Sequence, residues 1–353
     1  MNFQDIHLED KELWMQFLEY YRKGNYSSAL SLLQNKQLMP KGLTAENLNK
    51  LTDFIVQVEG LSDSSFKSNR IPCQLEQPSG QSSGEIWFRI DEPYPAVLND
   101  CPWSRIRQAS DDGIADLIWS VGDRKAVSLT EWGATGRYAV SAGTYYCYIL
   151  GFNHNSAIEG GNRIHFEFGF DSLSGGNHIA FCGTDFGLAW SNTNPYYIRM
   201  NSTATNSGGW KNSLMRTGTL NGSNRSFLNA IPADLKSVLK TVVKYTDNVG
   251  GGSGSVQSNV TATTDTIFIL NVNEIRGTGT ANTYEANYTK QYDYYKNGNA
   301  QNRAKSNDTA TLCNFFTRSP SPSDARFMGL SPSASGVYLT ANTVFAVSPA
   351  FCV

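Results

Sequence analysis

The chain has 353 residues, of which 17% are charged and 12% are aromatic, and its formal net charge is -2. This length allows two or three domains with a large core, and the aromatic content excludes a disordered chain. The balanced charge excludes the basic face that DNA or RNA binding needs. The sequence has no run of 18 apolar residues, so it predicts no membrane-spanning helix.

Residues 1–60 predict a short helical module. Apolar residues recur at three- and four-residue spacing in 13–21, 29–33 and 48–58. The first two helices resemble a single tetratricopeptide-like hairpin, which cannot bury its own apolar face. We therefore expect the module to attach to another copy, to the rest of the chain or to a larger assembly. The stripe in 48–58 suggests a homo-oligomer, with a trimer as the working hypothesis, or an intramolecular contact.

The amino-terminal residues contain neither the basic segment nor the apolar segment of a signal peptide. We therefore expect synthesis in a cytoplasm, which is a reducing compartment. The six cysteines form no Cys-x-x-Cys pair, so we expect buried free thiols rather than disulfides. They are Cys73, Cys101, Cys147, Cys182, Cys313 and Cys352.

A polar segment rich in Ser, Gly and Gln over residues 61–84 predicts a linker. Residues 85–353 then predict one large β-rich domain, so the fold class is α+β and mainly β. We expect strands from alternating or continuous apolar residues at 85–90, 145–152, 164–170 and 266–272. We expect short helices at 104–108, 212–220 and 233–239, and a flexible glycine-rich loop at 249–258.

Few residues suggest catalysis or metal binding. His165 and Glu167 would share one face of a strand, but no third ligand has a recognisable spacing, so we expect two structural side chains on the sheet face, each satisfied by other partners. The carboxylates that a glycosidase could use are Glu131, Glu167 and Glu274, and structural roles fit them better. Nucleophile and metalloprotease motifs are absent from the sequence. We therefore expect a protein that is not an enzyme, with no catalytic residue, metal or cofactor.

Eight ordered blocks resemble a family of uncharacterised domains that is frequent in phages and prophages of gut bacteria. The resemblance covers about residues 85–353. The blocks are 119–124, 149–155, 209–216, 231–238, 268–277, 292–295, 316–320 and 349–351. More weakly, residues 1–60 resemble amino-terminal segments of phage structural proteins.

The ending resembles the C-type-lectin-like fold of proteins that diversity-generating retroelements target. Residues 306–353 contain no Lys, Glu, Gln or Trp, which is the depletion that mutation of template adenines would leave, and Met328 is the exception. The family ending Val-Arg-Pro-Ala-Phe is here Val-Ser-Pro-Ala-Phe, with Ser348 in place of Arg. The calcium-binding motifs of sugar-binding C-type lectins are absent, so calcium-dependent sugar binding is not expected.

The resemblance implies a receptor-binding protein on a phage virion, made in the cytoplasm of the bacterial host. The helices of 1–60 would contact other virion proteins, and the variable segment 306–353 would contact a protein or glycan on the bacterial surface. Because changes in a core cost about 2–5 kcal/mol, variable positions should be exposed. The expected contact residues are Ser321, Ser323, Asp324, Arg326, Leu330, Ser331, Tyr338, Thr340, Asn342 and Phe345.

The expected frame around these positions consists of Phe316, Arg318, Pro320, Pro349, Ala350 and Phe351. Two alternatives remain open. One is a head-fibre, capsid-decoration or tail protein whose final segment only packs a core. The other is an enzyme on a lectin-like frame, as in the formylglycine-generating enzymes, which would need Cys313 and Cys352 as reactive thiols.

Overall fold

The chain divides into two compact units, Met1–Pro93 and Tyr94–Val353. The computed structural model describes residues 16, 20, 23, 73–74, 88–89, 94–135, 139–183, 186–189, 194, 196–277, 281–296, 304–306 and 311–353. In the first unit, β1 (Cys73–Gln74) pairs in parallel with β2 (Phe88–Arg89). A strand therefore lies inside the segment expected as linker. Apart from the helical residues Gln16 and Tyr20, the helices expected in 1–60 lie outside the described residues.

The second unit is mixed α and β, with more strand than helix across the structure and many strands near the carboxy terminus. Its strands are β3 (Arg124–Leu129), β4 (Trp132–Gly133), β5 (Ala139–Val140), β6 (Gly143–Phe152), β7 (Ile164–Phe170), β8 (Val242–Asp247), β9 (Val260–Asp265), β10 (Ile267–Phe268), β11 (Lys305–Ser306), β12 (Leu312–Cys313), β13 (Phe315–Pro320), β14 (Phe327–Leu330), β15 (Gly336–Leu339) and β16 (Ala350–Cys352).

Short helices connect the strands. They are α5 (Trp103–Asp111), α6 (Ala115–Ile118), α7 (Ser156–Glu159), α8 (Gly209–Asn212), a π-helical segment (Met215–Leu220), α9 (Phe227–Ala230), α10 (Ala233–Lys236), α11 (Val272–Arg276) and α12 (Asp293–Lys296), with 3-10 turns at Leu98–Asp100, Gln257–Asn259 and Thr283–Asn287. The three helical segments expected from the sequence in this unit are confirmed. None of the helices in the described residues is long and apolar enough to span a bilayer.

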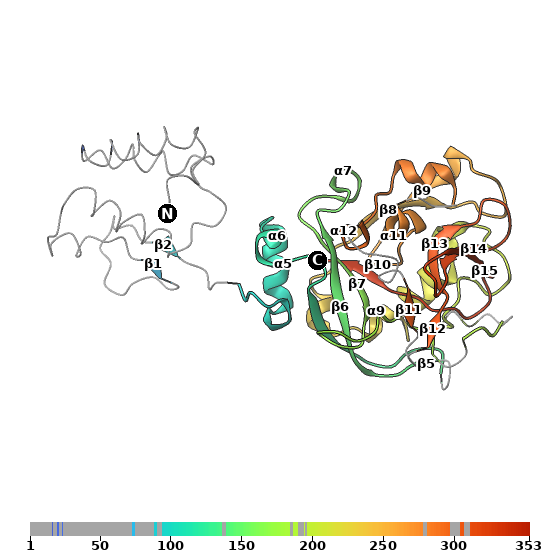
Figure 1. The fold of residues 1–353 in the computed structure, drawn as a ribbon, viewed down its shortest axis with the longest axis horizontal. Coiled ribbons are helices and arrows are strands. Elements are labelled where there is room, and N and C mark those ends of the chain that lie inside the picture. The colour runs from blue at the N-terminus through green and yellow to red at the C-terminus, as the bar shows by residue number, and fades with distance from the viewer. Residues whose placement is uncertain are drawn as a thin grey trace. The chain divides into compact units, whose positions relative to one another are not determined.

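A five-stranded antiparallel sheet of order β10-β16-β7-β6-β3 forms the centre of the second unit (Figure 1). The expected strands at 145–152 and 164–170 are confirmed as β6 and β7. The run expected as a strand at 266–272 is mostly not one. β10 ends at Phe268, because Asn271 and Glu274 form a capping box that starts α11.

Aromatic side chains fill the space beside the central sheet. Phe166 of β7 stacks on Phe351 of β16 with ring centroids 5.2 Å apart, and Trp103 of α5 meets Phe166 edge-on at 5.5 Å. Phe168 contacts Phe227 of α9 at 4.9 Å. Rings of this size bury much apolar area, so these contacts fix α5 and α9 to the sheet.

Every residue of β7 is buried, on both faces of the strand. The sequence alternates apolar and polar side chains along it, a pattern typical of a strand with one face in water. Here the polar face, which carries His165 and Glu167, is covered by other polar side chains instead. The core of this unit is therefore apolar on one side of β7 and hydrogen-bonded on the other.

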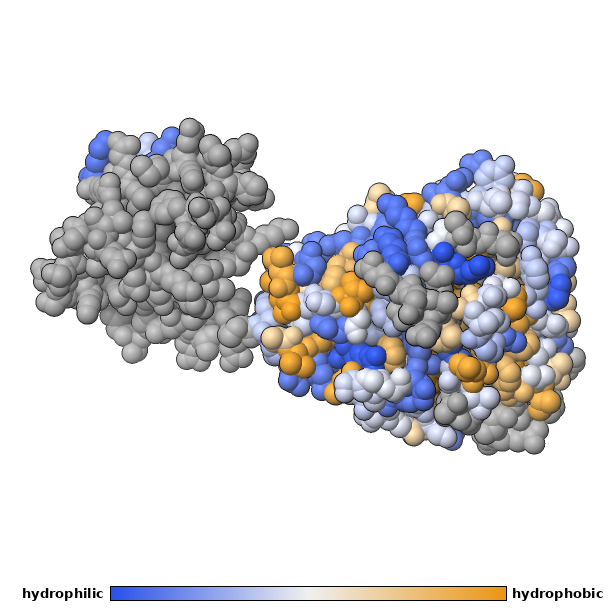
Figure 2. All heavy atoms as spheres, viewed as in Figure 1, coloured by the Kyte–Doolittle hydropathy of each residue, from blue (hydrophilic) through white to orange (hydrophobic). Residues whose placement is uncertain are grey.

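The three-stranded antiparallel sheet β13-β14-β15 lies at the end of the unit farthest from α5 and α6 (Figure 1). On the visible face of this unit, hydrophobic residues are scattered among hydrophilic ones and form no single large patch (Figure 2). The five cysteines whose side chains are described, Cys101, Cys147, Cys182, Cys313 and Cys352, are free and buried, as expected.

Candidate functional site

The three-stranded sheet carries most of the residues expected to contact a ligand. Ser323, Arg326 and Tyr338 are exposed. Asp324, Ser331 and Thr340 are partly exposed. These six side chains come from the loop between β13 and β14, the turn between β14 and β15, and β15 with the residue after it. The structure leaves all six accessible to a ligand, and their role in binding stays a prediction.

Four expected contact residues lie elsewhere. The expectation of exposure is wrong for Ser321 and Leu330, which are 0% exposed, and for Asn342, which is 9% exposed. Leu330 is buried because β14, the middle strand of this sheet, is buried along its whole length. Phe345 is half-buried and packs edge-on against Phe186 and Phe316, so it belongs with the core.

Asn206 holds the loop between β13 and β14. Its side-chain amide donates to the carbonyl oxygens of Ser321, Asp324 and Arg326 at 3.2, 3.0 and 2.5 Å. The Ser321 N–H closes the same loop by donating to the Arg326 carbonyl at 2.8 Å. Asn206 is completely buried, so it anchors the buried side of this loop, while the tip of the loop around Ser323 and Arg326 stays exposed. Sequence reasoning missed Asn206, since nothing in its local pattern marks it.

At the tip, Asp324 and Arg326 form an ion pair at 2.6 Å. The Arg326 guanidinium also lies over the Tyr338 ring, 5.1 Å from its centroid. The hydrogen bond from Arg326 lowers the pKa of Asp324, so both groups are charged at neutral pH. Loop and strand therefore present one continuous polar and aromatic surface.

The glycine-rich segment 249–258 lies against this loop. Gly250, Gly251 and Gly252 have positive φ angles of 60°, 69° and 69°. A Cβ on Gly250 would lie 2.1 Å from the Asn206 carbonyl oxygen, so only glycine fits there. The Gly254 N–H donates to the Pro322 carbonyl at 2.8 Å, which joins the two loops. The segment expected to be flexible therefore makes specific contacts and adds exposed residues beside the expected ones.

A buried ion cluster supports the sheet from inside. Arg318 of β13 binds the Glu274 carboxylate with both terminal nitrogens, at 2.5 and 2.9 Å. Lys244 of β8 bridges Glu274 at 3.1 Å and Glu159 at 2.6 Å. Burial alone would raise the pKa of Glu274, but Arg318 and Lys244 hold it well below its usual range. Two carboxylates and two cations give the cluster no net charge. The expected frame residues, Phe316, Arg318, Pro320, Pro349, Ala350 and Phe351, are all buried.

Three groups of this cluster could in principle hold a metal ion. Single ligand atoms of His154, Glu159 and Glu274 lie within 4.8 Å of one another. However, the Lys244 ammonium already contacts both carboxylates, and the cluster is electrically neutral without a further cation. Burial lowers the pKa of His154 to about 3, which keeps its ring neutral. Glu159 and Glu274 therefore bind the Lys244 ammonium at the place that a metal ion would occupy.

The three carboxylates singled out in the sequence are each paired with a cation. Glu131 binds Arg225 at 2.7 Å on the surface, and Glu274 belongs to the buried cluster. Glu167 binds Lys305 at 2.8 Å and accepts a hydrogen bond from the Tyr295 hydroxyl at 2.6 Å.

Ser348, the departure from the family ending, lies beside this second ion pair. It is 2% exposed, and Lys305 Nζ donates to its hydroxyl at 2.8 Å. Lys305 thus places a buried cation next to Ser348. Met328, the other departure, is 0% exposed and packs with Val272 and Ala281. Both residues therefore belong to the frame and not to the surface.

The thiols that an enzyme would need are deeply buried. Cys352 Sγ lies 3.3 Å from His165 Nδ1, but burial raises the pKa of Cys352 to about 12. Cys313 Sγ donates to the Lys305 carbonyl at 3.6 Å. A reactive cysteine needs a lowered pKa and access to solvent. Neither condition is met at Cys352, so this geometry does not support the enzyme alternative.

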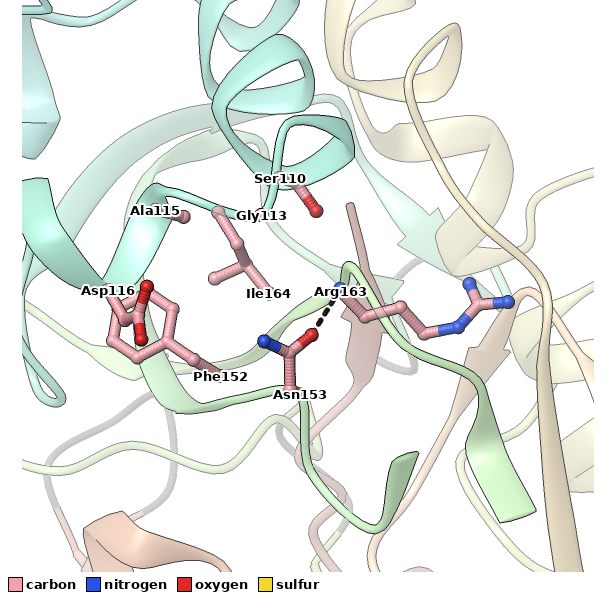
Figure 3. A pocket seen from close by; sticks show the side chains of 8 residues that line it. All are labelled: Ser110, Gly113, Ala115, Asp116, Phe152, Asn153, Arg163 and Ile164. Atoms are coloured by element: carbon pink, nitrogen blue, oxygen red, sulfur yellow. Dashed lines mark hydrogen bonds between the residues drawn. The ribbon is translucent and has the colours of Figure 1, made fainter. Parts of the chain in front are cut away.

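One small cavity lies between α5, β6 and β7 (Figure 3). It holds about 10 Å³, which is the room of a single water molecule. Asn153 Oδ1 accepts a hydrogen bond from the Arg163 main-chain N–H at 3.2 Å at its rim (Figure 3). A second, open hollow of about 390 Å³ is lined by Arg107, Arg163 and Lys240, and Asp111 pairs with Arg107 and Lys240, each at 2.7 Å.

A family model described as a domain of unknown function (DUF6273) matches residues 191–353. This match includes Asn206, the glycine-rich segment and the whole β13-β14-β15 sheet. No curated protein and no solved structure matches the chain.

Proposed function

We propose that this chain is a receptor-binding protein of a phage virion that presents a variable surface at its carboxy-terminal end. The contact surface consists of Ser323, Asp324, Arg326, Ser331, Tyr338 and Thr340. A C-type-lectin-like frame is part of the proposal, because the resemblance that implies it covers the segment that builds β13 to β16. In this proposal the first unit attaches the protein to other virion proteins, as a tail-fibre or similar adhesin.

One observation carries the proposal. Within a segment that lacks Lys, Glu, Gln and Trp, Asp324, Arg326 and Tyr338 form one accessible contact surface, and the residues beneath the loop are held by buried hydrogen bonds and ion pairs. Side chains can be exchanged on such a surface at little cost in stability, since surface substitutions usually change it by less than about 0.5 kcal/mol. Met328, which does not fit a diversified segment, and Ser348, which departs from the resembling family ending, are buried and would be fixed.

The chemistry of the surface also suits binding. Tyr and Arg provide large contact area and hydrogen bonds, and Ser and Thr adapt to different partners. Asn206 fixes the loop, so little conformational entropy is lost when a ligand binds.

Sequencing this locus across a phage population tests the proposal. We expect codon variation at the six surface positions, with Ser321, Met328, Leu330 and Ser348 unchanged. Variation that ignores burial, or an invariant segment without a template repeat beside it, would refute diversification.

A binding experiment tests the receptor role separately. The paired substitution Arg326→Ala with Tyr338→Ala should reduce binding of the full chain to host cells at least tenfold. The matched control is Arg225→Ala with Leu173→Ala, which removes a partly exposed arginine ion pair and an exposed apolar side chain elsewhere. Equal loss in both variants would contradict the assigned surface.

A further inference from the structure

Among the described residues, no strand pairs with the outer edge of β15. β15 is the last strand of the β13-β14-β15 sheet, and its register with β14 pairs Met328 with Tyr338 and Gly329 with Val337. A strand edge exposes main-chain N–H and C=O groups in a row, and only another extended chain can pair with all of them.

The register shows which main-chain groups face outward. On β13 the N–H groups of Phe316 and Arg318 donate away from β14, to Ala346 and Leu270. Phe315 therefore faces β14 and exchanges hydrogen bonds with Leu330.

Since main-chain groups alternate in direction along a strand, Gly329 of β14 then faces β15 and bonds Val337. The main-chain groups of Gly336 and Tyr338 consequently point outward. Among the described residues, neither of them has a main-chain partner on that side.

Natural proteins shield strand edges with very short strands, Lys, Pro, bulges or covering segments. Among the described residues, β15 has the first of these devices, its length of four residues, but lacks Lys, Pro and a bulge. The sequence Gly336-Val-Tyr-Leu339 has no charge and no proline, and residues 327–353 contain no charged side chain. Its pairing with β14 is regular over four residues, without a bulge. Tyr338, at the middle of the strand, is 38% exposed.

We infer that the outer edge of β15 binds an extended segment of a partner protein by adding it as a fourth strand to the β13-β14-β15 sheet. The inference rests on the proposed function and specifies the ligand class of that surface, a polypeptide instead of a glycan. Main-chain pairing gives affinity that does not depend on side chains. The exchangeable side chains at Arg326, Tyr338 and Thr340 would then set which segment binds.

A second copy of this chain fits the edge less well than a foreign segment. β15 has four residues and is about 13 Å long at about 3.3 Å per residue. A stable protein dimer buries about 1,600 Å², which so short an edge does not supply alone. A flexible peptide can bind a short edge weakly, and several copies on one particle raise the overall affinity.

The test uses the full chain and a random decapeptide library displayed for selection. Selected peptides are resynthesised in two forms with N-methyl groups on alternate residues. In an extended peptide, one form loses the N–H donors of one edge, and the other form loses the N–H donors of the opposite edge. We expect one form to bind at least tenfold more weakly than the parent peptide and the other to bind like the parent. Equal binding of both forms, or failure to select any peptide, overturns the inference.

A matched pair of variants tests the protein side. Tyr338→Pro removes the outward N–H, and Tyr338→Ala removes the same side chain but keeps that N–H. Proline is tolerated on an edge strand where the N–H faces solvent, and urea midpoints of the two variants check this. We expect at least tenfold weaker peptide binding for the proline variant than for the alanine variant.

Two outcomes separate this inference from the proposed function. In the first outcome, Tyr338→Pro and Tyr338→Ala bind host cells as well as each other, while the double variant Arg326→Ala with Tyr338→Ala binds them more weakly than wild type. This outcome confirms the surface and refutes the strand edge. If the wild-type chain self-associates in sedimentation and Tyr338→Pro alone abolishes it, the occupant is a second copy and the inference is overturned.

Discussion

The buried ion cluster under the binding surface gives the sharpest prediction. Arg318→Met leaves Glu159 and Glu274 with Lys244 alone, so the cluster changes from neutral to a net charge of -1. Glu274→Gln leaves one carboxylate with two cations, a net charge of +1. Removing one partner of a buried ion pair costs about 3–5 kcal/mol, because the remaining charge stays desolvated. We therefore expect each single variant to lose about 3–5 kcal/mol of unfolding free energy.

The double variant, Arg318→Met with Glu274→Gln, is neutral again through the Glu159–Lys244 pair. Its loss should be well below the sum of the two single losses, with a coupling energy of about 3 kcal/mol. Some cost remains, because Arg318 also donates to the Ile269 carbonyl at 3.0 Å, and an unpaired buried carbonyl costs about 1–3 kcal/mol.

Urea unfolding of the full chain, followed by tryptophan fluorescence, measures these losses. Trp132 and Trp210 are completely buried in the second unit and report on it. At about 3 kcal/mol per M, each single substitution should lower the midpoint by about 1–2 M. The control is Arg326→Met, which breaks an exposed ion pair and should cost less than about 1 kcal/mol. Additive losses in the double variant, or a control as damaging as Arg318→Met, would refute the reasoning.

Three further predictions concern the loop, pH and the second ion pair. Asn206→Ala should lower stability by about 2–3 kcal/mol and increase hydrogen exchange in residues 321–326, because it removes the hydrogen bonds that fix the loop; unchanged exchange would contradict this. Burial raises the pKa of Glu285 to about 7. Between about pH 4.5 and 7 the native state therefore keeps a proton on Glu285 that the unfolded state releases. As the pH rises through that window, the wild type loses about 3 kcal/mol of unfolding free energy. The Glu285→Gln variant lacks this term, so its stability relative to wild type should rise by that amount between those pH values, and a constant difference would speak against the buried proton. Lys305→Met should cost about 3–5 kcal/mol, and adding Ser348→Arg should recover part of it if Lys305 takes the place of the family arginine; no recovery would reject that interpretation.

The sequence predicted the elements whose pattern is local. β6, β7 and the short helices follow from apolar spacing and from turn residues. The burial of free cysteines follows from the expected reducing compartment and from the missing Cys-x-x-Cys spacing. The frame residues of 316–320 and 349–351 were also identified correctly, because aromatic, proline and arginine blocks in a polar segment indicate packing. Local pattern failed at 266–272, where the Asn271 capping box starts a helix inside an apolar run.

The candidate surface was predicted only in part. The depletion of Lys, Glu, Gln and Trp located it in the final 48 residues, and six of ten expected positions are accessible. Ser321 and Asn342 are polar and small enough to suit a surface, and only their place in the fold buries them. Asn206 and the glycine-rich segment join the surface from more than 60 residues away in the sequence.

Composition and local periodicity by themselves determined that this protein has a β-rich unit with a chemically distinct ending. Only the tertiary structure decided the role of its charged and polar residues. Alternation along β7 indicated a face in water, yet His165 and Glu167 are buried, because Tyr292, Tyr295 and Lys305 from distant segments cover them and form hydrogen bonds with His165 Nδ1 and the Glu167 carboxylate. A side chain's burial depends on which segments pack over it, and periodicity in one strand carries no information about those partners.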